Sequence, residues 1–188
     1  MPEGPSIVIL KELTASFKGK TVVSVTGNSK LDIQRMAGKK ILDIKSWGKH
    51  YLLRFKDFSL RVHFMLFGSY RINEEKKTAP RLGLKFAKGQ LNFYACSLKF
   101  IEEDLDEVYD WSADIMADEW DTAKARKKLK AKPDMLACDA LLDQDIFAGS
   151  GNIIKNEVLF RTQIHPLSVV GMIPAKKLSE MVRETSNY

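Results

Sequence analysis

Short runs of alternating apolar and polar residues fill the first part of the chain. β-Branched and aromatic residues recur at every second position within these runs, and Gly, Asn and Asp separate them, which is typical of strands and turns. The runs predict seven strands, over residues 21–25, 40–44, 51–55, 59–64, 69–73, 81–86 and 91–94. Short strands at this spacing favour a β-sandwich or a barrel.

Helical spacing replaces this alternation on both sides of the strands. Before them, Pro5 suits the first turn of a helix whose apolar residues would be Ile7, Leu10, Leu13 and Phe17. After residue 112 the pattern predicts four helices, over residues 117–130, 134–147, 152–162 and 174–185. The predicted fold is therefore α+β: an N-terminal β-sandwich domain with a leading helix over residues 1–112, then an all-helical domain over residues 113–188.

The charge of the chain favours a polyanionic partner without establishing one. The 188 residues carry a formal net charge of +6, which suits nucleic acid. Residues 124–132 hold six Lys and Arg in nine positions and are interpreted as a solvated helix face. No apolar run has the length of a membrane span, and the acidic Glu3 is unlike a signal peptide, so we expect a soluble intracellular protein.

The two cysteines, Cys96 and Cys138, lie far apart and outside any Cys-x-x-Cys arrangement. This argues against a zinc site and against a disulfide framework in this chain. Each is predicted to be a small buried apolar residue in a reducing compartment, and neither a metal nor another cofactor is expected.

The N-terminal sequence Met1-Pro2-Glu3-Gly4-Pro5 carries candidate chemistry. Removal of Met1 would make Pro2 a terminal secondary amine, and an α-amino group titrates near about pH 8. Attack of such an amine on an aldehyde-level carbon gives an iminium ion, which withdraws electrons for elimination, and Glu3 could transfer the proton. For these residues alone, an arbitrary start to the chain is the better interpretation.

The turn Gly149-Ser150-Gly151-Asn152 lies between two apolar helical stretches. Glycines let one helix end and the next begin within a few residues. The free N–H groups of the new helix, together with the Asn152 amide, would form a phosphate cradle. An ordinary connection between two helices explains the same turn equally well.

Two other segments also leave alternatives open. Lys49 lies at a predicted turn where it could hold a phosphate, although a solvated surface lysine is the commoner case. Met65, Leu66 and Phe67 follow a predicted strand and could wedge into a base stack if exposed. From the sequence alone, a buried position in the core is favoured for these three.

In combination and order, these segments closely resemble the formamidopyrimidine-DNA glycosylase/endonuclease VIII family. The resemblance spans essentially the whole chain and rests on residues 1–5, 48–49, 63–71, 149–161 and 164–166. The stretch from 149 to 166 is similar to the helix-two-turns-helix DNA-binding motif of that family. Pro-Glu-Gly-Pro resembles the endonuclease VIII branch, which prefers oxidised pyrimidines, more than the Pro-Glu-Leu-Pro branch specific for 8-oxoguanine and formamidopyrimidines.

The resemblance implies a bifunctional DNA glycosylase and abasic-site lyase of base excision repair. Pro2 would form a Schiff base at C1′ of the damaged nucleotide, and Glu3 would be the acid/base that assists opening of the sugar ring. Lys49 would bind a phosphate at the lesion. The implied partner is double-stranded damaged DNA, bound by a monomer in the bacterial cytoplasm or nucleoid, with no role for a membrane.

The implied DNA contacts come from two segments. Asn152, with Gly151 beside it, would bind a neighbouring phosphate. Leu66, flanked by Met65 and Phe67, would fill the gap left by the extruded nucleotide, because a base cannot be attacked inside the stack.

Three departures from the family pattern matter. Ser6 stands where many members carry a second glutamate, and residues 94–100 lack the Asp-Pro-Arg-Arg-Phe pattern of the formamidopyrimidine branch. The sequence ends at Tyr188, about where the zinc finger of the family would begin. That finger would carry a DNA-gripping arginine, and it would be the only place for zinc. We therefore expect weak DNA binding and poor cleavage. An appended finger that brings no gain in incision would contradict this expectation.

Two alternatives to the enzyme remain at this point. The first is a damaged-DNA-binding module that is catalytically weak or inactive, which the absent finger and Ser6 would explain. The second is an RNA-binding protein, since helix-turn-helix elements and basic charge also suit structured RNA. The Pro2-Glu3 terminus makes the second alternative the weaker one.

Overall fold

The computed structural model describes residues 2–187, which form two units. The β unit comprises Pro2, residues 6–46 and residues 50–108, and the helical unit comprises residues 3–5, 47–49 and 109–187. The division after Val108 differs from the boundary expected after residue 112. It lies earlier because Tyr109 packs against Trp47 in a tilted arrangement with ring centroids 4.9 Å apart, and the Asp110 carbonyl accepts a 2.9 Å hydrogen bond from Trp47 Nε1.

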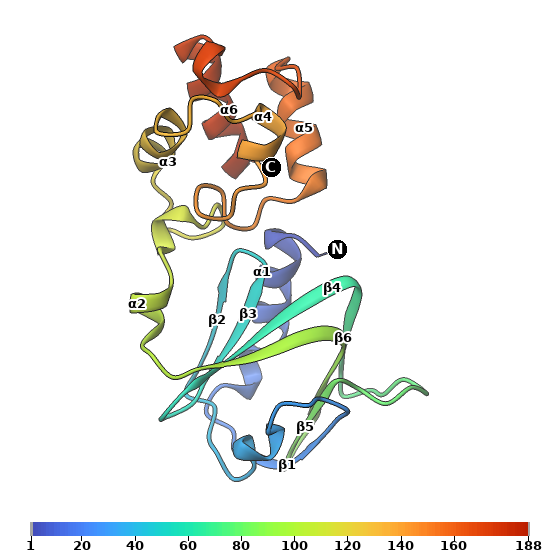
Figure 1. The fold of residues 1–188 in the computed structure, drawn as a ribbon. Coiled ribbons are helices and arrows are strands. Elements are labelled where there is room, and N and C mark those ends of the chain that lie inside the picture. The colour runs from blue at the N-terminus through green and yellow to red at the C-terminus, as the bar shows by residue number, and fades with distance from the viewer. Residues whose placement is uncertain (1, 188) are drawn as a thin grey trace. The chain divides into compact units, whose positions relative to one another are not determined.

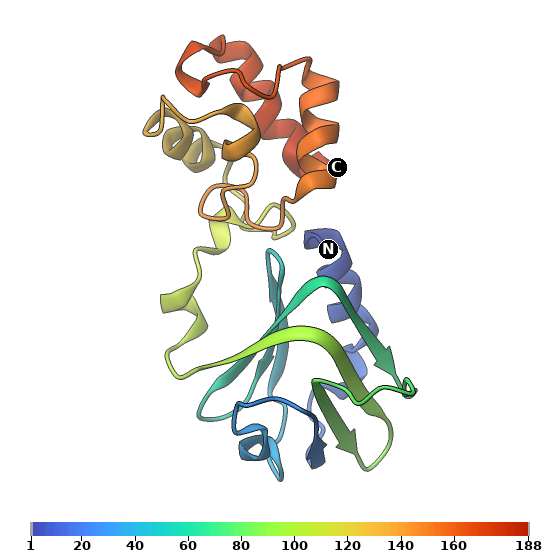
Figure 2. The ribbon, with the colours of Figure 1, turned by 45° about the vertical axis from the view of Figure 1, so that its right-hand side comes forward.

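The β unit is built on one six-stranded sheet with the strand order β1-β5-β6-β4-β3-β2 (Figure 1). Its strands pair antiparallel. They are β1 (Val22–Thr26), β2 (Asp43–Trp47), β3 (His50–Arg54), β4 (Ser59–Ile72), β5 (Leu82–Phe86) and β6 (Gln90–Ile101). The α+β class is confirmed, with one continuous hydrogen-bonded sheet. The long strands β4 and β6 curve strongly (Figure 2), so that side chains from both halves of the sheet share one core.

Several strand limits differ from the sequence prediction. The predicted strands over 59–64 and 69–73 are parts of the single strand β4, and β6 continues beyond the predicted end at Tyr94 to Ile101. β2 begins at Asp43, because Lys40 makes only an isolated bridge to Thr21.

Helix α1 (Gly4–Leu13) places two of its predicted apolar residues, Ile7 and Leu10, in the core of the sheet. Leu13, which has the same helical spacing, is 55% exposed. The buried Thr14 Oγ1 instead turns inward, donating to the Leu10 carbonyl at 2.7 Å and lying 2.8 Å from the Tyr51 hydroxyl. Burial raises the pKa of Tyr51, which keeps this hydroxyl protonated as a hydrogen-bonding group.

The helical unit contains α3 (Thr122–Lys130), α4 (Ala137–Ala140), α5 (Asn152–Thr162) and α6 (Ala175–Asn187), and the β unit ends with α2 (Leu105–Val108). Single 3₁₀ turns lie at Ala15–Phe17, Ile33–Met36, Trp111–Ala113 and Val170–Met172. Residues of α3 to α6 share a second hydrophobic core. Within residues 2–187, no helix combines the length and apolar character needed to cross a membrane.

Side-chain hydrogen bonds explain why two predicted helices are shorter than expected. α3 begins at Thr122 because the Asp121 carboxylate caps it, accepting from the N–H groups of Ala123 and Lys124 at 2.8 and 3.0 Å. α4 covers one turn of the predicted 134–147 helix. Asp143 beyond it accepts instead from the Asp145 N–H at 3.0 Å, a local bond that competes with helix formation.

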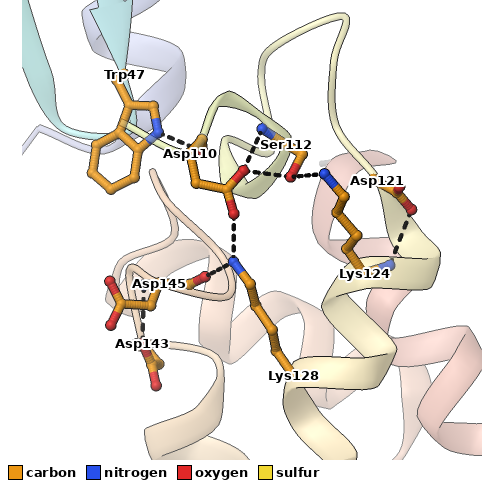
Figure 3. Close-up of polar contacts among 8 residues, drawn as sticks. All are labelled: Trp47, Asp110, Ser112, Asp121, Lys124, Lys128, Asp143 and Asp145. Carbon is orange, nitrogen blue, oxygen red and sulfur yellow. Dashed lines mark hydrogen bonds and ion pairs between the residues drawn. The ribbon is translucent and has the colours of Figure 1, made fainter. Parts of the chain in front are cut away.

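The basic run over residues 124–132 is not simply a solvated face. Lys124, Lys128 and Lys132 are spaced four positions apart, and their amino groups contact Ser112 Oγ at 3.3 Å, Asp110 Oδ2 at 2.7 Å and Asp143 Oδ2 at 2.5 Å. Lys128 also donates to the Asp145 carbonyl at 2.6 Å (Figure 3). Half of the run therefore stabilises the segments around it.

Asp110 should make the stability of the helical unit pH-dependent. Hydrogen bonds from Lys128 and then Ser112 lower the pKa of its carboxyl group below the ordinary 3.8. Such a group stabilises the fold above its unfolded pKa, and this contribution is lost as the pH falls through the lower folded value. Asp110→Asn should therefore lower the free energy of unfolding at neutral pH by less than about 1 kcal/mol, because the ion pair is partly exposed. Urea unfolding across pH checks this, and a difference that persists well below pH 3.8 would contradict it.

Candidate active site

The Glu3 side chain is fixed at the N-terminus of α5. Only 8% of the residue is exposed. Its Oε2 accepts hydrogen bonds from the N–H groups of Gly151 and Ile154, each at 3.1 Å, and its Oε1 accepts from Ile153 at 2.8 Å. These donors have no partner within the first turn of a helix, and they stabilise negative charge placed there. The carboxylate is thus held in one position by three donors that lie far away in the sequence.

This contact corrects the predicted phosphate cradle. The N–H groups of Gly151, Ile153 and Ile154 were expected to bind an external phosphate, but the Glu3 carboxylate takes that place. Asn152 is exposed, and its Oδ1 accepts from Lys155 Nζ at 3.1 Å. The predicted phosphate contact of the Asn152 side chain therefore stays a prediction.

Two glycines permit the close approach of the segments around Glu3. A Cβ atom at Gly151 would lie 2.5 Å from Glu3 Cδ. The Gly4 N–H donates to the Gly149 carbonyl at 2.8 Å, and a Cβ at Gly4 would lie 3.2 Å from Gly149 Cα. The sequence interpretation assigned Gly151 to a turn, whereas its main effect is to leave room for a carboxylate.

Lys49 follows a turn that is held in the same unit. Gly48 has a φ of +51°, and a Cβ there would lie 2.8 Å from the Gly149 nitrogen. The Gly48 N–H donates to Asp114 Oδ2 at 3.0 Å. Lys49 is half-buried, and its burial lowers the pKa of the amino group, while the negative charge of Glu3 acts in the opposite direction. The structure therefore brings Lys49 into the electrostatic field of Glu3.

Asp114, which is 2% exposed, is a site residue that was not predicted from the sequence. Its Oδ2 accepts from Gly48 and its Oδ1 from the Met116 N–H at 3.0 Å. An acidic residue in a segment without helical or strand periodicity does not by itself indicate this role. A weak indication came from the glycines in the segments that contact Asp114, since close backbone contact requires glycine.

Pro2 lies in the β unit, where it lines a cavity of about 440 Å³. The walls include apolar residues of α1 and β4, such as Ile7 and Phe64, and the polar residues Ser6, Ser69 and Arg71. Met1, whose removal would free the Pro2 amine, lies outside the described residues. The cavity offers an apolar body with a few hydrogen-bonding groups, which is the usual composition of a small-ligand pocket.

Met65, Leu66 and Phe67 are 52%, 61% and 84% exposed, so the core position favoured from sequence is wrong. Phe64 pairs with Cys96 and Ser69 with Tyr94, so β4 carries three more residues than β6 across this step. The extra residues bulge outward and leave the three apolar side chains in solvent. Their predicted insertion into DNA remains a prediction, but the exposure that it requires is present.

The described residues provide no ligand set for zinc. Among residues 2–187, no group of three or more His, Cys, Asp or Glu side chains is arranged to hold a metal ion. Cys96 is buried, as predicted, and burial raises its thiol pKa to about 12. Cys138 is only partly buried, which differs from the prediction.

Comparison with known proteins gives consistent results over both units. The profile described as "Formamidopyrimidine-DNA glycosylase N-terminal domain" matches residues 1–101, and "Formamidopyrimidine-DNA glycosylase H2TH domain" matches residues 112–187. Endonuclease 8-like 3 of Xenopus laevis is 26% identical over 89% of this chain and 29% of its own length. DNA-(apurinic or apyrimidinic site) lyase Nei2 of Mycolicibacterium smegmatis is 28% identical over 92% of this chain and 71% of its own length. The chain thus spans less than a third of the first relative.

Solved structures show the same fold. Lactococcus lactis formamidopyrimidine DNA glycosylase, solved non-covalently bound to DNA containing an AP site, superimposes with a TM-score of 0.84. The match covers 98% of this chain and 79% of that one, at 22% sequence identity.

Proposed function

Because this chain belongs to the formamidopyrimidine-DNA glycosylase family, we propose that it acts in base excision repair, removing a damaged base from DNA and cleaving the strand at the resulting abasic site. One observation carries the proposal: the residue after Pro2 is a buried carboxylate, fixed by three N–H donors and close enough to a half-buried lysine to affect its pKa. A carboxylate, a cation and an adjacent amine are the groups that Schiff-base chemistry on a sugar requires.

The Pro2 amine, once freed from Met1, would attack C1′ of the damaged nucleotide. The N–C1′ bond to the protein forms, the glycosidic bond breaks, and the base leaves with a proton. Opening of the sugar ring places a proton on O4′ and gives an iminium ion, for which Glu3 is the proposed proton carrier. Loss of a C2′ proton expels the 3′ phosphate, a second elimination expels the 5′ phosphate, and hydrolysis of the iminium frees Pro2.

Lys49 would bind a phosphate next to the reacting sugar, and Asn152 a neighbouring one. A half-buried cation binds a phosphate more strongly than a fully solvated one, because less water screens the interaction. Leu66, with Met65 and Phe67, would fill the space left by the extruded nucleotide, for which the exposed bulge of β4 is suited.

We propose oxidised pyrimidines as the favoured lesions and the cavity of the β unit as the base pocket. Pro2 lines this cavity, and Ser6, Ser69 and Arg71 offer hydrogen bonds to the oxidised edge of a base. The Ser69 hydroxyl oxygen already accepts a hydrogen bond from Lys76 Nζ at 2.6 Å, which fixes its orientation. The location in the bacterial cytoplasm or nucleoid stays a prediction, and so does the monomeric state.

Incision assays on matched duplexes test the proposal. The Met1-free protein should cleave a plain abasic site, and should cleave thymine glycol and dihydrouracil faster than 8-oxoguanine. Cleavage of 8-oxoguanine alone would overturn the pyrimidine preference. Binding of these duplexes without any incision would favour the inactive DNA-binding module instead.

The half-buried position of Lys49 predicts a particular pH dependence. Since burial lowers its pKa, the alkaline limb of the pH–rate profile on abasic-site DNA should lie below the ordinary lysine value of 10.5. Lys49→Arg keeps its charge to above about pH 12 and should move this limb upward. Lys49→Met should lower kcat/KM about 10- to 100-fold, because the variant loses one charge-assisted hydrogen bond. An alkaline limb that stays in place in Lys49→Arg would mean that another group titrates there.

A further inference from the structure

A groove in the helical unit lies between α3 and α6 and takes no part in the proposed DNA chemistry. Its floor is apolar and well packed: Val170, Ile173 and Leu178 are 2%, 9% and 5% exposed. Arg126 and Lys130 of α3 form its rim. We call this feature the α3–α6 groove.

The rim of the α3–α6 groove carries two positive charges that form no ion pair with an acidic side chain among residues 2–187. Three other lysines of α3 and its extension use their amino groups inside the unit, as Figure 3 shows for Lys124 and Lys128. Arg126 donates only to the hydroxyl of Ser179, at 3.3 Å, and neither Arg126 nor Lys130 forms an ion pair with a carboxylate of the described residues. Like charges one helical turn apart repel each other, which a ligand of opposite charge would relieve.

Size and lining decide what kind of ligand fits. The groove encloses about 220 Å³, less than the roughly 300–1,000 Å³ of a typical small-molecule or cofactor pocket. That volume suits a single bulky side chain. A phosphate backbone would use the two cations but would gain nothing from an apolar floor. Met172, between two groove residues, is 83% exposed and extends the apolar surface.

We propose that the α3–α6 groove binds a short acidic peptide segment of a partner protein. One bulky apolar side chain of the peptide would anchor on Val170, Ile173 and Leu178, and its carboxylates would bind Arg126 and Lys130. A buried apolar anchor supplies most of the affinity in such contacts, and the charges at the rim supply orientation and specificity. This inference does not depend on the proposed repair activity.

Fluorescence anisotropy with the whole chain tests it. The probe is a fluorescein-labelled peptide made of consecutive aspartates ending in phenylalanine. Two matched peptides replace the phenylalanine with serine or the aspartates with asparagine. The protein variants are Arg126→Glu/Lys130→Glu and a control with the same charge change at exposed lysines outside the groove, Lys127→Glu/Lys56→Glu.

The acidic, phenylalanine-bearing peptide should bind saturably, and each matched peptide at least about tenfold more weakly. Arg126→Glu/Lys130→Glu should weaken binding at least about tenfold, while the control variant leaves it unchanged. Ala175→Trp fills the groove from an exposed position without changing charge, and should also block the peptide. Circular dichroism establishes that each variant is folded.

Absence of saturable binding would overturn the proposal. So would equal binding of either matched peptide, or equal weakening by the control variant. Undamaged duplex DNA provides the competing case. If Arg126→Glu/Lys130→Glu weakens DNA binding and Ala175→Trp leaves peptide binding intact, the groove is a DNA contact and not a peptide site.

Discussion

Gly151→Ala is expected to lower the free energy of unfolding by about 2–4 kcal/mol and to remove most of the proposed lyase activity. The new Cβ would lie 2.5 Å from Glu3 Cδ and 2.7 Å from Glu3 Cγ, so the carboxylate must withdraw. The N–H groups of Gly151, Ile153 and Ile154 then lose their acceptor. An unsatisfied buried donor costs about 1–3 kcal/mol, and partial hydration of the three N–H groups reduces their summed cost.

The cause of this effect is steric and not conformational. Gly151 has a φ of −132°, which alanine adopts without strain. Gly38→Ala provides the matched control, because Gly38 has a φ of +75° with nothing within 4 Å of an added Cβ. That variant should lose only about 1 kcal/mol from backbone strain and should retain full activity. Urea unfolding and cleavage of abasic-site DNA measure both variants, and a Gly151→Ala chain equal to wild type in both would refute the steric role.

Glu3→Gln is expected to reduce cleavage about 10²- to 10⁴-fold, the range attributed to a positioned acid or base. Both oxygens of Glu3 accept N–H bonds, whereas a glutamine amide has one oxygen and one NH₂ group. In either orientation the NH₂ group faces at least one N–H donor, so the variant should also lose about 1–3 kcal/mol of stability.

A double-mutant cycle tests whether the two changes act on one interaction. Glu3→Gln and Gly151→Ala both disturb the same carboxylate–amide contact, so their effects on stability should be clearly less than additive. Additive effects would mean that alanine at 151 acts elsewhere. The loss of activity in Glu3→Gln should appear mainly in kcat, because a residue that only supports the fold would not selectively slow the chemical step.

Local patterns predicted the elements whose ends are set locally. α5 has the predicted limits because Gly151 precedes its periodic apolar residues and Gln163, with a φ of +54°, ends it. The predicted helix over 134–147 failed because Asp143 forms local hydrogen bonds that a hydrophobic period cannot reveal.

The errors at the candidate site have a common cause, which is contact between distant segments. The partner of the α5 N–H groups is Glu3, about 150 positions earlier, so the free donors predicted from residues 149–152 were already in use. The exposure of residues 65–67 depends on the pairing of β4 with β6, where Ala95 opposes the bulge with a φ of +47°. The sequence around residues 149–152 does not reveal the contact with Glu3, and the sequence around residues 65–67 does not reveal the pairing of β4 with β6. The resemblance assigned functions to Pro2, Glu3 and Lys49, but the hydrogen bonds that fix the Glu3 carboxylate required the fold.

Mapping the covalent adduct tests the role of the Pro2 amine most directly. The Met1-free chain is incubated with abasic-site DNA and borohydride, which reduces the iminium to a stable amine, and the trapped protein is digested and analysed by mass spectrometry. We predict that the sugar remnant is attached to the nitrogen of Pro2, and that protein retaining Met1 gives no such adduct. An adduct on a lysine such as Lys49, or equal trapping with Met1 in place, would contradict the assignment.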